Sequence, residues 1–150
     1  MHRSLLALGL CLALSSACGD SAPTAPTPSQ TIDLTGNWRG NITVGSTAAS
    51  MVWTLTQTGT AVSGPVILVL PTGTVLLNGA LTGTVNGSAL TYAIAVNAGG
   101  IPAQPQCVGQ LGGTMTAAIG AVSTLSGSLA VTTSTCATGV PAGAITLTKQ

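Results

Sequence analysis

From Leu34 to the C-terminus, apolar residues alternate with threonine, serine and asparagine, and this period of two is the feature that most restricts the fold. In one segment Trp38, Ile42 and Val44 alternate with Arg39 and Thr43. Successive side chains of a β-strand point to opposite faces, so one face becomes apolar and the other polar. Threonine, serine, glycine, valine and leucine dominate and glutamate is absent, which disfavours solvated helices. The sequence therefore predicts an all-β domain.

Turn residues divide this alternation into eight predicted strands. Asn86-Gly87 is the clearest turn signal, because a two-residue hairpin requires positive φ at both positions. Gly59, Gly73 and Gly120 mark three further turns. The predicted strands span residues 36–45, 50–58, 61–70, 74–85, 88–97, 106–118, 122–132 and 143–149.

A short motif of the form apolar-small-Gly-any-apolar occurs five times in these strands, at residues 34–38, 62–66, 81–85, 111–115 and 125–129. With a period of two, each glycine lies on the same face as its two apolar neighbours, which is the buried face. Glycine weakens a strand, so its repetition indicates either sharp bends in a small barrel or space for a large side chain opposite. Both explanations favour a sheet that curls on itself.

The strand count and the glycines predict an eight-stranded antiparallel up-and-down β-barrel, with a two-sheet β-sandwich as the alternative. A chain of 150 residues has room for one such domain. The interior of an eight-stranded barrel holds either packed side chains or one small ligand. Seven inward residues are the candidates for lining a ligand cavity: Trp38, Met51, Trp53, Leu81, Tyr92, Met115 and Leu129.

The N-terminus has the features of a targeting segment. A positive start at residues 1–3 precedes an apolar run from Leu5 to Leu14. A transmembrane helix needs about 20 residues, so this run has the length of a signal-peptide core instead. We therefore expect a signal peptide at 1–17, a Pro/Thr/Ser-rich tether at 18–33 and the barrel domain at 34–150.

The run Leu14-Ser15-Ser16-Ala17-Cys18 resembles the lipobox of bacterial lipoproteins, with the large aliphatic residue one position further upstream than usual. The resemblance implies that Cys18 becomes the first residue and carries diacylglyceryl and palmitate-type acyl chains. Two or more chains give stable membrane attachment. Gly19 in place of an aspartate implies the outer membrane. The alternative is a secreted or periplasmic protein in which Cys18 is a free thiol.

Cys107 and Cys136 remain as a pair in a protein that has left the reducing cytoplasm, which predicts a disulfide. If the hairpin turn lies near Gly120, Cys107 faces about residue 133, close enough to Cys136 for a bridge. No CxxC motif or Cys/His cluster is present, so we expect no metal site.

The tripeptide Gly36-Asn37-Trp38 resembles the G-x-W signature that opens the first strand of lipocalins and avidins, the calycin group of β-barrels. The resemblance implies that Trp38 closes one end of the barrel beneath a lysine or arginine from late in the chain. Lys149 is the residue in that position.

The charged residues outside the signal peptide are Asp20, Asp33, Arg39 and Lys149. General acid–base catalysis needs a titratable side chain in a cleft, and phosphate binding needs clustered Lys and Arg. We therefore expect no enzymatic activity, no cofactor and no nucleic-acid partner. The predicted function is that of a non-catalytic surface lipoprotein whose barrel binds a small apolar ligand. Two alternatives are a protein-interaction or inhibitor module that uses the loops at 97–106 and 133–142, and a passive surface-coat protein.

Overall fold

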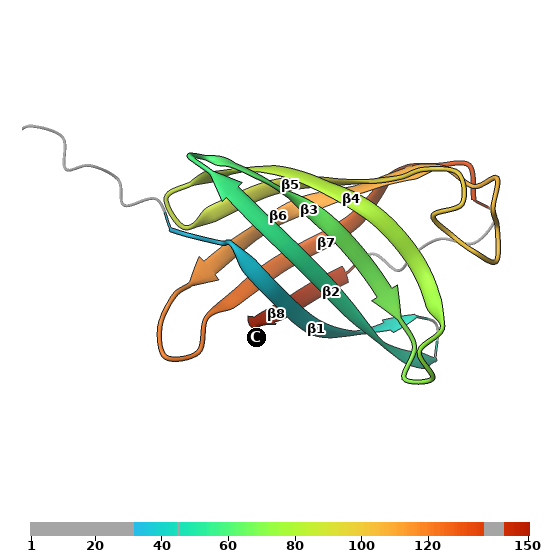
Figure 1. Ribbon diagram of the computed structural model, residues 1–150, viewed down its shortest axis with the longest axis horizontal. Coiled ribbons are helices and arrows are strands. Elements are labelled where there is room, and N and C mark those ends of the chain that lie inside the picture. Colours follow the sequence, from blue (N-terminus) through green and yellow to red (C-terminus); the bar gives the residue numbers. More distant parts are fainter. Residues whose placement is uncertain (1–31, 45, 137–142) are drawn as a thin grey trace, which may run out of the picture.

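The computed structural model describes residues 32–44, 46–136 and 143–150. These residues form a closed antiparallel barrel in which each strand pairs with the next and β8 pairs with β1 (Figure 1). The strands are β1 (Gly36–Val44), β2 (Thr47–Thr58), β3 (Ala61–Val69), β4 (Val75–Asn86), β5 (Ala89–Val96), β6 (Gly109–Ala118), β7 (Thr124–Ser134) and β8 (Gly143–Lys149). The predicted all-β class and up-and-down barrel are confirmed, and the β-sandwich alternative is wrong. The predicted signal peptide and tether up to residue 31 lie outside the described residues.

Because neighbouring strands run in opposite directions, the connections gather at two ends of the barrel. The Trp38 end carries the start of β1, the end of β8 and the turns that follow β2, β4 and β6. The disulfide end carries the β3–β4 turn, the long connection from β5 to β6, and Cys136 after β7. The first described residues, which precede β1, therefore lie at the Trp38 end.

Two of the turns at the Trp38 end are tight two-residue hairpins. Thr58 pairs with Ala61 and Asn86 pairs with Ala89. The first turn residues, Gly59 and Gly87, have φ of 60° and 58°, a region that favours glycine. The β4–β5 turn is therefore Gly87-Ser88, one residue later than the predicted Asn86-Gly87.

The inward glycines mark places where neighbouring backbone approaches closely. A Cβ on Gly64 would overlap the carbonyl oxygen of Thr54, and the β2–β3 pairing skips these residues between Trp53↔Val66 and Thr56↔Ser63. The β6–β7 ladder is interrupted in the same way beside Gly113. Glycine allows the strands to bend here so that the sheet closes. The bend explanation of the motif therefore holds at these two copies.

Space for a large side chain, the other explanation, applies around Tyr92. This residue pairs with Gly83 on one side and with Gly113 on the other. A Cβ on Gly83 would lie 2.9 Å from a methyl group of Leu90 and 3.2 Å from the Cβ of Tyr92. Because neither glycine has a side chain, the tyrosine ring has room inside the barrel between them.

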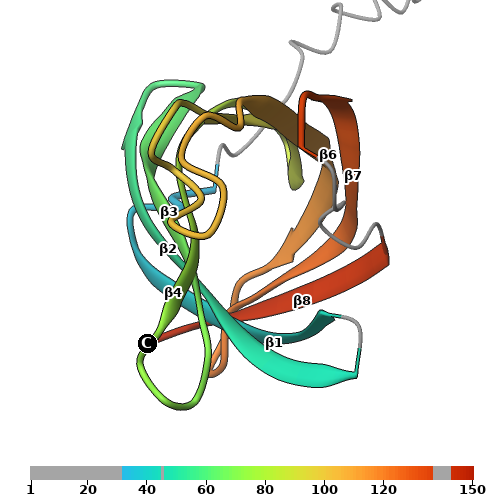
Figure 2. The same ribbon diagram turned by 90° about the vertical axis from the view of Figure 1, so that its right-hand side faces the viewer.

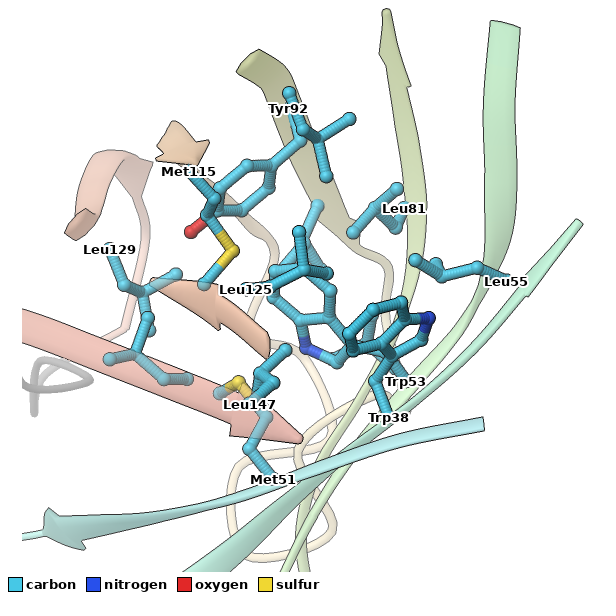
Figure 3. Packing of buried hydrophobic residues seen from close by; sticks show 14 of the residues in the cluster. Trp38, Met51, Trp53, Leu55, Leu81, Tyr92, Met115, Leu125, Leu129 and Leu147 are labelled. Atoms are coloured by element: carbon cyan, nitrogen blue, oxygen red, sulfur yellow. The ribbon is translucent and has the colours of Figure 1, made fainter. Parts of the chain in front are cut away.

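The interior is a single apolar cluster, and no polar or charged side chain of the described residues is classed as buried. Trp38 and Trp53 are completely buried within it. The rings of Trp53 and Tyr92 meet edge to face, with centroids 5.0 Å apart and planes at 60° (Figure 3). Such aromatic pairs stabilise a core beyond the area that they bury. The hydroxyls of Thr and Ser lie on the outer face, as the alternation predicts.

Candidate functional site

The seven residues predicted to line a ligand cavity all lie in the apolar cluster, at 4% exposure or less. Their side chains converge on one another in the middle of the barrel (Figure 3). Of these seven, Leu129 alone also lines one of the two pockets described below. The structure therefore brings the candidates together as packing partners of one another.

Tyr92 carries the phenol of this cluster. Its hydroxyl donates a 2.8 Å hydrogen bond to the carbonyl oxygen of Ser128. Burial raises the pKa of Tyr92 to about 12, so the phenol is neutral at physiological pH. Tyr92 is therefore a neutral hydrogen-bond donor held toward Ser128.

The Trp38 end of the barrel is sealed by side chains. The Nζ of Lys149 lies 5.6 Å from the centroid of the Trp38 ring, and the indole nitrogen donates a 2.8 Å hydrogen bond to the Leu34 carbonyl. Gln57 bonds to the amide of Leu34 and the carbonyl of Ile32, both at 2.8 Å. The position expected of Lys149 from the G-x-W resemblance is confirmed, and Leu34 and Trp38 are completely buried at this end.

The disulfide end is held together by Cys107–Cys136, which confirms the predicted bridge. Gly109 pairs with Ser134, so the same register places Cys107 directly opposite Cys136. The predicted partner level, residue 133, was three residues short. The β6–β7 turn is centred on residue 121 instead of the expected Gly120. A shift of one residue in the centre of a hairpin moves each paired residue by two, which accounts for two of the three. The third comes from Thr132, an extra residue at a bulge opposite Gln110 and Leu111.

The connection of residues 97–108, here called the 97–108 loop, is fixed at several points. Its Gly100 carbonyl accepts a 2.7 Å hydrogen bond from the Asn78 amide of β4, and Gly99 bonds to the Pro105 carbonyl at 2.7 Å. Ile101 packs against the core cluster, and Cys107 is buried. Pro102, Ala103, Pro105, Gln106 and Val108 remain exposed. The loop therefore presents uncharged side chains from a rigid backbone.

A small apolar pocket lies beneath this loop. Its volume is about 20 Å³, the space of about one water molecule. Leu77, Val96, Ile101, Leu111 and Val131 supply its apolar walls. The sequence reading did not identify these residues as a site. The signal that could have shown it is Ile101, which lies between glycine and proline and is the one large aliphatic residue between Val96 and Val108.

A second recess follows the seam between β1 and β8. These strands pair only at Trp38↔Lys149 and Arg39↔Thr148, and they diverge toward the disulfide end (Figure 2). The recess between them has a volume of about 320 Å³ and is open to solvent. Its walls are residues 41–43 and 143–145, with Leu129 at its floor, and none of these side chains is ionisable.

Charged groups are sparse in the described part of the chain: Asp33, Arg39 and Lys149. A hydrogen bond from the Thr35 side chain, together with one from its amide at 2.8 Å, holds the pKa of Asp33 below its usual value. No cluster of three His, Cys, Asp or Glu residues lies within 32–44, 46–136 and 143–150. Those residues also include no helix long and apolar enough to cross a membrane.

Comparisons with protein-family models, with curated proteins and with solved structures find no match to this chain. The functional conclusion therefore depends on the geometry of the chain's own residues.

Proposed function

We propose that this chain is a non-catalytic bacterial lipoprotein, anchored through Cys18, that binds another protein through the exposed side of the 97–108 loop. The observation that supports this proposal most is that the disulfide, the backbone hydrogen bonds and the packing of Ile101 hold this loop in place. A loop held in one conformation loses little conformational entropy on binding, which favours affinity. A rigid scaffold that presents such a loop is a common arrangement in binding proteins.

The packed interior supports this proposal over a ligand deep in the barrel. The two tryptophans, Tyr92 and the surrounding aliphatic side chains occupy the space that a ligand would need. The ionisable groups of the described residues lack a base placed beside a nucleophile, which supports a binding role over catalysis.

The position of the tether also supports the proposal. Chain direction puts the start of β1 at the Trp38 end and the 97–108 loop at the opposite end. A barrel anchored through Cys18 in the outer membrane would present this loop away from the lipid surface.

A second candidate function is the binding of a small apolar ligand at the mouth of the barrel. The apolar walls of the pocket beneath Ile101 favour it. A ligand larger than one water would have to displace the Ile101 side chain. The G-x-W segment and Lys149 favour kinship with the calycin group, in which barrels of this type hold such ligands.

Affinity capture from intact cells tests the protein-binding role, with a charge placed on the loop by Ala103→Asp. The matched control is Ile67→Asp, at an exposed apolar position on the outside of β3. We expect one stoichiometric partner that is lost with Ala103→Asp and retained with Ile67→Asp. A partner retained by both variants, or none in either, contradicts the proposal.

Native mass spectrometry of the detergent-extracted protein tests the second candidate. A retained small-molecule adduct that disappears with Ile101→Trp, a substitution that fills the pocket, would support ligand binding. Palmitate labelling of the wild type and of Cys18→Ser tests the anchor, and label that persists in the variant contradicts it.

A further inference from the structure

The turn between β6 and β7 differs from the other tight turns at the Trp38 end. The last residue of β6, Ala118, and the turn residues Ile119, Gly120, Ala121 and Val122 are consecutive, apolar and exposed, and we call them the apolar tip. Ile119 is 53% exposed and Val122 is 67% exposed, the highest values among the large hydrophobic residues of the described chain. Exposing a run of apolar residues this long to water is unfavourable, so such a run usually marks a functional surface.

The neighbouring turns at the same end show that the fold does not require this composition. The β2–β3 turn is Gly59-Thr60 and the β4–β5 turn is Gly87-Ser88, and both are followed or preceded by polar side chains. The two large side chains of the apolar tip lie mostly in solvent, and Gly120 between them has open space around it, since a Cβ there would meet no atom within 4 Å. The exposed isoleucine and valine are therefore available to a partner outside the domain.

The position of the apolar tip identifies that partner. The β6–β7 turn and the first described residues lie at the same end of the barrel (Figure 1). Strand β8 links this turn to the start of β1, since the Ser123 carbonyl accepts a 2.9 Å hydrogen bond from the amide of Lys149, which itself pairs with Trp38. Residues 19–31 separate Cys18 from Ile32, and such a Pro-rich segment reaches at most about 40 Å. A lipid on Cys18 would keep this end of the barrel near the membrane.

We propose that the apolar tip inserts into the lipid surface to which Cys18 is attached, and so orients the barrel with its disulfide end outward. This inference rests on the proposed lipidation of Cys18. Two large and three small apolar groups bind a bilayer weakly by themselves, but the tether raises their local concentration at the surface. The tip has no charged side chain whose transfer into the interface would oppose insertion.

Photo-cross-linking to lipid tests the proposal. The full lipidated protein is reconstituted in phosphatidylethanolamine/phosphatidylglycerol vesicles that contain a phospholipid with a diazirine in its acyl chain, and cross-linked peptides are mapped by mass spectrometry. We expect adducts on the peptide that contains residues 118–122 and none on the peptide that contains Pro102 and Ala103. The double variant Ile119→Ser/Val122→Ser should lose the adducts.

The control variant is Ile67→Ser/Val75→Ser, which removes two exposed apolar side chains elsewhere and should keep the adducts. Equal labelling of the two peptides, or labelling unchanged in the tip variant, would overturn the proposal. If mass spectrometry finds Cys18 unmodified, the proposed anchor fails. The tip is then tested separately by coupling the Cys18 thiol to a maleimide phospholipid, and the same adducts decide the outcome.

Discussion

The hydroxyl of Tyr92 on β5 donates its hydrogen bond to the carbonyl oxygen of Ser128 on β7, across the intervening strand β6. The residue of β6 that pairs with Tyr92 is Gly113, and a Cβ on it would overlap this same carbonyl. The missing side chain therefore opens the path between the tyrosine and the serine. Gly113 therefore makes possible the partly buried hydrogen bond between Tyr92 and Ser128.

Replacing Tyr92 by phenylalanine should lower the free energy of unfolding by about 1–2 kcal/mol, because the substitution keeps the ring but removes the donor. Urea denaturation of the two proteins measures the difference. Thr91→Val on the outer face of the same strand is the control, and we expect it to change stability by less than about 0.5 kcal/mol. Equal midpoints for Tyr92→Phe and the wild type would show that the bond contributes nothing.

The raised pKa of Tyr92 predicts a loss of stability in alkali. An exposed tyrosine in the unfolded chain ionises near pH 10, whereas the folded protein holds the proton to about pH 12. Between these values the unfolded state binds fewer protons, so stability is complete below pH 10 and falls as the pH rises toward 12. Denaturation series from pH 8 to 12 measure this slope. The slope should be smaller in Tyr92→Phe, and identical slopes would contradict the assignment.

Adding a methyl group at Gly113 should destabilise the barrel, because the new Cβ would collide with the Ser128 carbonyl. We expect Gly113→Ala to cost about 1–3 kcal/mol. The matched control is Gly120→Ala, where a Cβ has open space and the expected change is within about 0.5 kcal/mol. Thermal unfolding monitored by circular dichroism compares the two. Similar melting temperatures would refute the close-approach role of the strand glycines.

Loss of the disulfide should weaken the barrel and release the 97–108 loop. Cys107 and Cys136 are 29 residues apart, and in the chain-entropy model closing such a loop stabilises a protein by about 3–4 kcal/mol. The double variant Cys107→Ser/Cys136→Ser should lose that amount in chemical denaturation. Amide exchange at Gly99 and Gly100 should also become faster, since their hydrogen bonds lie within the released loop. Unchanged exchange there would show that Ile101 and the backbone bonds are sufficient to fix the loop.

Much of the architecture could be predicted because each strand is half-buried, so its period of two is visible in the sequence. The eight predicted strands correspond to the eight observed ones. The differences lie at their ends, where pairing and not composition decides the boundary: β2 begins at Thr47 instead of residue 50, and β6 at Gly109 instead of 106. Residues 106–108 alternate between exposed and buried as a strand would. In the structure, however, Cys107 forms the disulfide and bonds to the Gln104 carbonyl within the loop.

The register and the site were less accessible to prediction. The predicted residue opposite Cys107 was three positions too low: the turn centre at residue 121 accounts for two of them, and the bulge at Thr132, which no distinctive residue marks, accounts for the third. The inward position of Tyr92 could be predicted. Its hydrogen bond to Ser128 could not, because it depends on the order of the strands in the barrel and on the pairing of Tyr92 with Gly113. The pocket beneath Ile101 likewise depends on how a long connection folds back over the barrel mouth. Periodicity reports which face a side chain occupies and not which distant strand it meets.

The closing of the ring by β1 and β8 sets the order in which the molecule can assemble. All other strand pairs join sequence neighbours, whereas this one joins the first strand to the last, and it does so through only two residue pairs. Joining segments so far apart costs the most chain entropy and contributes few bonds in return. The ribosome must therefore synthesise β8 before β1 and β8 can pair and close the barrel. A secreted precursor would therefore stay incompletely folded, and able to pass through a translocation channel, until β8 emerges.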